Sequence, residues 1–253
     1  MAAGIGTLMT ERQFRVAFSK LQDKHKRLLK NALGNPPDYR NVPKDLWQKI
    51  QQEEAAIYLL LMSGVGLAAA QVAGSGIERK TGGAVTQADV RLALRKEAFA
   101  RASWAARQTT GTVQRKIRSI IERLDEDAEP GDVVDRVFTE GRVNRITVNE
   151  TVAATTAGTR AVQAAARDAQ VESFLVWRLG TCQHCKVCPL LDRTDEAFWG
   201  DVTTGPPIHP NCCCYTTVEF GERADLVRSG VLRARYPSEG ELIAAIRSSG
   251  WKL

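Results

Sequence analysis

All six cysteines of this chain lie in one short stretch of its 253 residues, and the rest of the chain contains none. Three of them follow the pattern Cys182-x-x-Cys185-x-x-Cys188, and the other three are consecutive, from Cys212 to Cys214. Cross-links or metal bonds made by these thiols can therefore hold only one local part of the fold. The long cysteine-free remainder has to be stabilised by burial of apolar side chains, which a chain of this length can achieve.

A bound metal ion explains the cluster better than disulfides do. Neighbouring Cα atoms lie about 3.8 Å apart, which is below the range of about 4.4–6.8 Å that a disulfide needs. The consecutive cysteines therefore cannot pair with one another, and each would need its own partner among the three upstream thiols. The N-terminus also lacks the charged and apolar segments of a secretory signal, so an oxidising compartment is not expected. Disulfides and unliganded thiols remain the alternatives.

The simplest tetrahedral set of ligands is Cys185, Cys188, His209 and Cys212, because it consists of two pairs with the same x-x spacing. Thiolate and imidazole ligands in this pattern are typical of a structural zinc site, and the sequence predicts bound Zn²⁺. Cys214 is an alternative to Cys212. Residues two apart on a strand point to the same side, so either thiol could face the ion.

The remaining groups near the cluster receive simpler interpretations. Cys182 and Cys213 are interpreted as free thiols, and His184 as a solvent-facing spacer. A catalytic zinc is not expected, because the sequence contains neither His-Glu-x-x-His nor the His-x-Glu and Pro-Cys-x-x-Cys of zinc deaminases. No nucleophile with an adjacent base stands out, so the protein is predicted not to be an enzyme.

The motifs around the cluster are similar to those of a known family. They are Trp177-Arg178-Leu179, then Cys185-Lys186-Val187-Cys188-Pro189-Leu190-Leu191-Asp192, and then Gly205-Pro206-Pro207-Ile208-His209-Pro210-Asn211-Cys212-Cys213-Cys214. In this order they resemble the phage Mu protein F-like family, the minor head or head-morphogenesis proteins of tailed phages. The resemblance covers roughly residues 140–220, and the chain departs from the family pattern at Arg193 and Cys213.

The resemblance implies a structural virion protein. It implies docking on the phage portal protein or the major capsid protein, in multiple copies, to assist head assembly, DNA packaging or DNA ejection. The expected location is the virion, in the inner head near the portal, and the host cytoplasm during assembly. Packaged DNA is a secondary candidate partner.

The positive charge of the chain is concentrated near its N-terminus. The sequence carries a formal net charge of +6, and residues 1–50 account for all of it. Five basic side chains follow one expected helix: Lys20, Lys24, Lys26, Arg27 and Lys30. Such a stretch can contact DNA or an acidic protein surface, and a zinc-containing nucleic-acid-binding protein is the alternative function. A solvated helix is the simpler interpretation, and no aromatic side chains are interleaved to stack on bases.

The expected fold class is mainly α, with an elongated helical N-terminal region and a small α+β C-terminal module clipped by the zinc site. The expected domains are a helical, partly basic region for portal or assembly contact at 1–130, a head-morphogenesis module with a zinc-binding hairpin at 131–222, and a helical tail at 223–253. Capping residues and apolar periodicity predict helices over 10–33, from 43, from 86 with a break at Gly111, over 142–168, and from 237. Alternating residues predict strands over 171–179 and 214–220.

Residues 55–73 form an uncharged apolar segment long enough to span a membrane. Two glycines, Ser63, Gln71 and many alanines make it less apolar than a leucine-rich spanning helix, so a buried helix is expected. Contact with a membrane during ejection is the remaining alternative.

Overall fold

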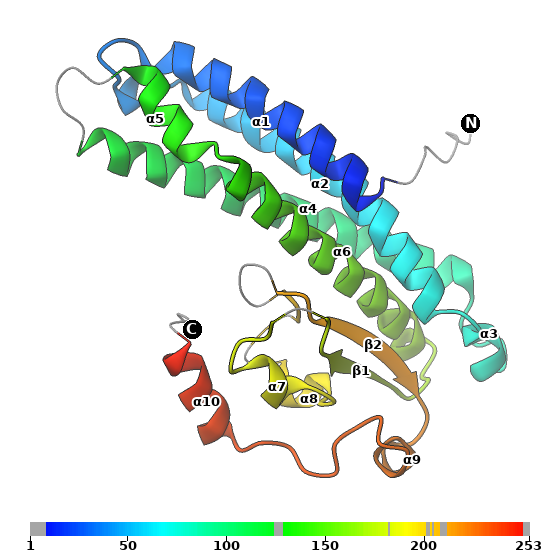
Figure 1. Ribbon diagram of the computed structural model, residues 1–253. Helices are drawn as coiled ribbons and strands as arrows, with labels where there is room; N and C mark the ends of the chain where they lie inside the picture. The colour runs from blue at the N-terminus through cyan, green and yellow to red at the C-terminus, as the bar shows by residue number, and fades with distance from the viewer. Residues whose placement is uncertain are drawn as a thin grey trace, which may run out of the picture. The chain divides into compact units, whose positions relative to one another are not determined.

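The computed structural model describes residues 9–123, 129–181, 183–200, 203, 205–207 and 212–249. Within these residues the protein is mainly helical and has one two-stranded sheet, as the sequence predicted. The chain divides into two compact units, which we call the helical unit (Met1–Leu61 and Phe99–Thr147) and the sheet unit (Met62–Ala98 and Val148–Leu253). Three long helices, labelled α2, α4 and α6 in Figure 1, contribute residues to both units.

The helical unit is assembled from parts of five helices. They are α1 (Glu11–Leu33), the first half of α2 (Lys44–Ala73), the second half of α4 (Gln87–Ile121), α5 (Pro130–Val137) and the first turns of α6 (Glu140–Asp168), together with a 3₁₀ turn at Tyr39–Asn41. Helices α1 and α5 lie side by side (Figure 1). One core cluster of the unit is aliphatic apart from one indole and consists of Leu29, Leu33, Val42, Trp47, Ile50, Val113, Ile117, Val133, Val134 and Val137. Phe14, Phe18 and Tyr58 are also fully buried in this unit, and their rings pack against one another.

A capping box sets the start of α1. The backbone N–H of Gln13 donates to the Thr10 hydroxyl at 3.3 Å, and the Thr10 N–H donates to the Gln13 side chain at 2.8 Å. These bonds satisfy N–H groups that a helix start otherwise leaves unpaired. The helix ends where Gly34 adopts a φ of 76°, a conformation that favours glycine. Both ends agree with the sequence prediction.

The predicted break at Gly111 is wrong, because α4 continues through it to Ile121. Glycine inside a helix costs about 1 kcal/mol relative to alanine. The next turns bury Val113 and Ile117 almost completely in the core of the helical unit, and burial of two such side chains contributes more than that cost. Tertiary packing therefore outweighs local propensity at this position.

A buried polar network links four helices within the helical unit. The Glu54 carboxylate on α2 accepts hydrogen bonds from Gln22 Nε2 and Thr110 Oγ1, both at 3.0 Å, and Arg142 donates to Gln22 Oε1. Glu54 is fully buried, and burial raises its pKa to about 7. The network favours one register of the helices, because a slip would leave buried polar groups without partners.

The sheet unit contains the antiparallel strands β1 (Ser173–Arg178) and β2 (Tyr215–Phe220), which confirms the predicted strand pair. A segment of the connecting chain covers the outer edge of β1. The backbone N–H of Trp177 donates to the backbone carbonyl of Thr194, and the backbone N–H of Arg193 donates to the backbone carbonyl of Trp177. The chain between the strands is thereby tied back onto the sheet.

The C-terminal half of α6 packs on one face of the sheet. The hydroxyls of Thr159 and Thr216 lie 2.6 Å apart, and both side chains are buried. Helix α2 crosses α6 closely, since a Cβ added at Gly158 would lie 2.2 Å from the Gly66 carbonyl oxygen. No side chain fits at this crossing, so glycine is required there.

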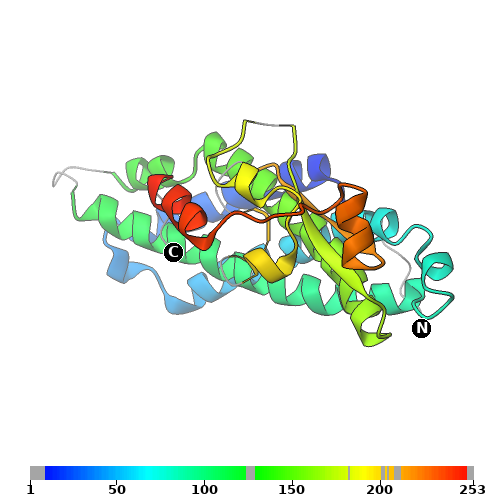
Figure 2. The same cartoon turned by 90° about the horizontal axis from the view of Figure 1, so that it is seen from below.

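C-terminal residues cover the other face of the sheet. Val176 packs against Leu226 of α9 (Arg223–Arg228) and against Leu232. The chain then continues to α10 (Glu239–Ser248), and Figure 2 shows this course from below. The strands are therefore enclosed between α6 and the C-terminal segment.

Several short helices in the connections were not predicted. Among them are α3 (Ile77–Lys80), α5, α7 (Cys188–Leu191) and α8 (Glu196–Trp199). The Glu196 carboxylate accepts hydrogen bonds from Arg160 at 2.9 Å and from Arg167 at 2.8 Å, which holds α8 against α6.

The apolar segment 55–73 lies within α2. Among the described helices, α2 has the length and composition to cross a membrane, and 33% of its most apolar window is buried inside the protein. Tyr58, Leu61 and Met62 are fully buried, whereas Leu60 and Val72 are exposed. The side chains on one side of the segment are therefore buried inside the protein, and those on another side are exposed.

Candidate metal centre

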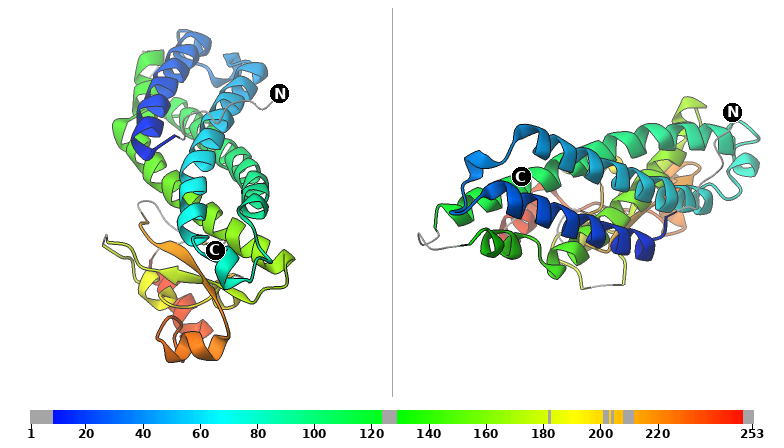
Figure 3. Two further views of the ribbon diagram at one scale, coloured as in Figure 1. Left: turned by 90° about the vertical axis from the view of Figure 1, so that its right-hand side faces the viewer. Right: turned by 90° about the horizontal axis from the view of Figure 1, so that it is seen from above.

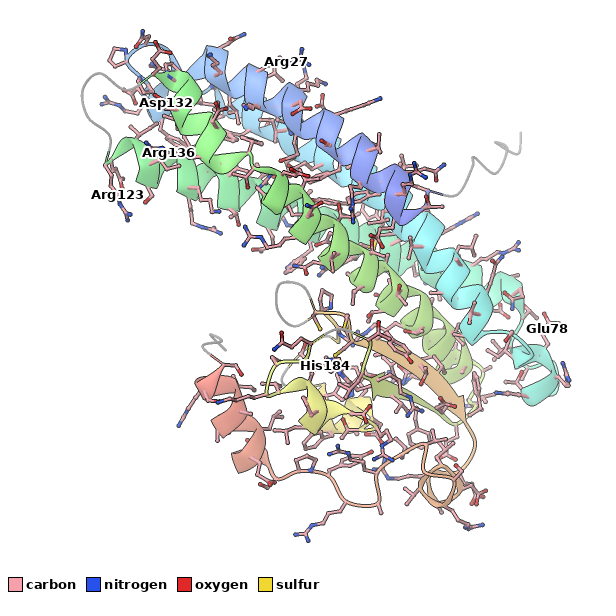
Figure 4. The ribbon with its side chains drawn as sticks, in the orientation of Figure 1. Arg27, Glu78, Arg123, Asp132, Arg136 and His184 are labelled. Carbon is pink, nitrogen blue, oxygen red and sulfur yellow. The ribbon has the colours of Figure 1, made fainter. Side chains whose placement is uncertain are left out.

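The two strands bring the cysteine-bearing segments together. Arg178 at the end of β1 lies opposite Tyr215 at the start of β2, so the residues after β1 and before β2 meet at one end of the sheet. Figure 4 shows His184 at this end. Four cysteines that form no disulfide gather here: Cys185, Cys188, Cys212 and Cys214.

Cys188 occupies the centre of this thiol cluster. Its Sγ lies 3.4 Å from Cys185 Sγ, and its thiol also forms hydrogen bonds with Cys212 and Cys214. Cys185 is half-buried, whereas the other three thiols are fully buried. One thiol thus contacts three others, an arrangement suited to thiolates that share a bound cation.

His184 adds an imidazole to the cluster. The ligand atoms of His184, Cys188 and Cys214 all lie within 4.8 Å of one another. His184 Nδ1 is 3.8 Å from Cys214 Sγ, and Nε2 is 3.0 Å from the Gly180 carbonyl oxygen. When Nε2–H donates to this carbonyl, Nδ1 keeps its lone pair directed at the thiols. Metal-binding histidines are commonly oriented by such a bond from the second ring nitrogen.

The spacing of the donors fits a tetrahedral ion. Two sulfur atoms, each about 2.3 Å from such an ion, lie about 3.7 Å apart. The Sγ atoms of Cys185 and Cys188 are 3.4 Å apart, which is close to this value. The sheet unit therefore contains a His/Cys cluster within metal-binding distance. Among the described residues it offers five donor groups, and a tetrahedral ion uses four.

The protein groups alone disfavour ionised thiols in the cluster. Hydrogen bonds with Cys212 and Cys214, together with burial, raise the pKa of Cys188. The hydrogen bond with Cys188 lowers the pKa of Cys214, but the hydrogen bond with Cys212 and burial outweigh it, and the pKa rises to about 11. A cation reverses such a preference, because it favours the charged form of its ligands.

Two tryptophans form the apolar wall of the cluster. Trp177 at the end of β1 is fully buried, and its indole lies beside Cys214. Its ring meets that of Trp199 edge to face, with centroids 5.6 Å apart. This wall restricts the access of water and fixes the position of the neighbouring thiol.

All four cysteines predicted as ligands belong to the cluster, and the predicted ligand His209 lies outside the described residues. The interpretation of His184 as a solvent-facing spacer is wrong, because its ring is half-buried and its Nδ1 faces the thiols. Its position directly before Cys185 is the signal in the sequence that could have identified it.

The interpretation of Cys213 as a free thiol is also wrong, because this residue is disulfide-bonded. Cys182, the other cysteine interpreted as free, lies outside the described residues. Neighbouring residues in extended chain point to opposite sides, which separates Cys213 from Cys212 and Cys214. Consecutive cysteines cannot pair with one another, but Cys213 still forms a disulfide with a partner elsewhere.

Ion pairs neutralise part of the basic stretch on α1. Lys24 Nζ lies 2.6 Å from Glu53 Oε1, and Lys26 pairs with Asp135. Arg27 is exposed on α1, as Figure 4 shows. The positive charge offered to an anionic partner is therefore smaller than the sequence alone indicates.

Comparisons of this chain with known protein families, with curated proteins and with solved structures gave no match.

Proposed function

We propose that this chain is a structural, non-enzymatic minor head protein of a tailed phage, and that a bound zinc ion holds its sheet unit together. It contacts the portal protein or the major capsid protein in the inner head, in multiple copies, and assists assembly, DNA packaging or ejection. The thiol and imidazole cluster carries the proposal, because its cysteine donors come from the motifs that resemble those of phage Mu protein F-like proteins.

Zinc is the proposed metal because the donors are sulfur and imidazole nitrogen. Calcium and magnesium require oxygen ligands, whereas zinc takes four Cys or His ligands in a tetrahedron. His184, Cys188 and Cys214 are the proposed core of the ligand set, with Cys212 or Cys185 as the fourth ligand. The ion would join the segment after β1 to the segment before β2, so that its binding energy adds to the folding energy of the unit.

A structural role suits the cluster better than a catalytic one. A catalytic zinc keeps an open coordination position and a general base nearby. Here most donors are fully buried, and among the described residues the metal-binding group contains no carboxylate. The cluster therefore suits a metal ion that stabilises the fold better than one that takes part in a reaction.

Metal analysis of the reduced, purified full chain tests the zinc site. We expect one zinc per chain, lost in Cys188→Ser and in His184→Gln but retained in His25→Gln, which alters a buried histidine of the helical unit. Zinc retained in full by His184→Gln would remove this residue from the ligand set and favour His209. A zinc-free wild-type protein would overturn the metal assignment.

Co-purification with the portal and major capsid proteins of the same genome tests the role in the head. We expect a stable complex with one of them. Double-stranded DNA, titrated at low and at high salt, tests the alternative function, because phosphate binding weakens steeply as salt rises. If the chain binds DNA in a salt-sensitive manner and forms no complex with either phage protein, under conditions where all proteins fold, the role in the head is refuted and the nucleic-acid-binding function is favoured.

A further inference from the structure

We propose that Cys185 and Cys188 form a redox-sensitive latch, in which a peroxide converts the two thiols into a disulfide and thereby releases the metal ion. The inference rests on the proposed zinc site, but not on the proposed role in a phage head. It follows from the unequal exposure of the four thiols and from the central place of Cys188 among them.

The geometry places an accessible thiol next to a buried one. Cys185 is half-buried and can meet a small oxidant, whereas Cys188 is fully buried. Their Sγ atoms are only 3.4 Å apart. Redox-sensing cysteines are typically accessible and have a second cysteine within reach to resolve the oxidised form.

The reaction balances with a peroxide as the oxidant. The Cys185 sulfur attacks one oxygen of hydrogen peroxide, the O–O bond breaks, and a sulfenic acid and one water form. The Cys188 thiolate then attacks the Cys185 sulfur and expels hydroxide, which is protonated to a second water. The solvent supplies the protons that zinc binding had removed from the thiols. The two sulfurs lose two electrons together, and the peroxide gains them.

Formation of this disulfide would dismantle the metal site. Cys188 contacts the other three thiols of the cluster, so its loss as a donor removes the centre of the cluster. Of the described donors, His184, Cys212 and Cys214 would remain, one fewer than a closed tetrahedral site needs. A thiol reductant together with zinc would restore the site, because thiol–disulfide exchange is reversible.

Peptide mapping of the peroxide-treated, zinc-loaded full chain identifies the partner of Cys188. Trypsin cleaves after Arg178, Lys186, Arg193 and Arg223, so that Cys188 is the single cysteine of peptide 187–193. We expect fragment-ion masses of the linked peptides to assign a new disulfide between Cys188 and Cys185 of peptide 179–186, and we expect the bound zinc to pass to a chromogenic chelator. A new bond from Cys188 to Cys212 or Cys214 instead, assigned in the same way, would overturn the proposal.

Two variants complete the experiment. Cys185→Ser should slow zinc release by peroxide at least about tenfold, because buried thiols react slowly, whereas Lys186→Ala, which changes an exposed side chain and keeps every donor, should remain sensitive. Equally fast release from Cys185→Ser would refute the latch. If Cys185→Ser binds no zinc, the peptide map of the wild-type chain decides alone. If the wild-type chain holds no zinc, the zinc proposal fails, and the same map still shows whether the two thiols pair.

Discussion

Two alanine substitutions in α6 should change stability in opposite directions. Gly158 lies in the crossing with α2, where an added Cβ would be 2.2 Å from the Gly66 carbonyl oxygen and 2.9 Å from Ala69 Cβ. Gly141 lies on the same helix, and a Cβ added there would meet nothing within 4 Å. The same chemical change therefore tests packing at one site and helix propensity alone at the other.

The magnitudes follow from these distances. Ordinary contact begins at 3.4 Å, so at Gly158 the two backbones would have to separate by roughly 1 Å. Overpacking of this kind costs about 1–3 kcal/mol, and the upper end applies because the obstacle is backbone. Alanine returns up to about 1 kcal/mol of helix propensity. Gly158→Ala should therefore lower the free energy of unfolding by about 2 kcal/mol, and Gly141→Ala should raise it by about 0.5–1 kcal/mol.

Denaturant titration followed by circular dichroism measures both variants against the wild type. The crossing also positions Thr159, whose hydroxyl lies 2.6 Å from that of Thr216 near the start of β2. Gly158→Ala should therefore weaken metal binding as well, whereas Gly141→Ala should not. If Gly158→Ala were as stable as Gly141→Ala, the close approach of α2 and α6 would be wrong.

Other substitutions and changes of pH probe the remaining features. Trp199→Ala should lower the free energy of unfolding by about 3–5 kcal/mol, since the indole is fully buried, and Trp199→Phe should recover most of this loss in the same denaturant titration. Ser238→Ala should cost about 1 kcal/mol, because it removes the capping box of α10; a smaller loss than that of Trp199→Ala in thermal unfolding would agree. Zinc affinity, measured by chelator competition, should rise with pH, because the raised pKa of Cys188 makes its thiol release a proton on binding. In a His25→Gln background, the free energy of unfolding should fall by about 3 kcal/mol in total as pH rises from about 4.5 to about 7. Burial raises the Glu54 pKa from 4.5 to about 7, so the folded state holds a proton that the unfolded state releases in this range. This background is needed because burial lowers the His25 pKa, and that shift by itself makes the free energy of unfolding rise with pH. A free energy of unfolding that rises with pH in the His25→Gln variant would contradict the buried position of Glu54.

Helix ends were predictable because capping is local. The Thr10 and Ser238 capping boxes each involve side chains three residues apart, and both occur where the sequence placed them. The strands were predictable from alternation, since each keeps one side toward a core. The break at Gly111 was wrong because the burial that carries α4 through it comes from residues distant in the sequence. The division into two units was likewise hidden, because each unit joins two separated segments.

The candidate site was predictable in its thiols but not in its details. Spacing alone identified the cysteines that gather at the end of the sheet. The place of His184 depends on how the loop folds back toward Gly180, and the pairing of Cys213 depends on the direction of each side chain. Both are set by tertiary structure. The position of His184 directly before Cys185 marks it as a candidate, but it does not fix where the ring points.

The position of the cluster explains why this fold benefits from a bound ion. A two-stranded sheet is marginal by itself, and the chain from 179 to 214 that joins β1 to β2 costs entropy when its ends are brought together. The donors lie immediately before β2 and shortly after β1, where that entropy would pull the strands apart. Figure 3 shows the paired strands in two further views. An ion held by Cys188 and Cys214 would connect the two ends of the loop at the weakest point of the sheet. Oxidation of Cys188 would remove the connection at the same point. The redox state of the Cys185 and Cys188 pair would then control the stability of the sheet.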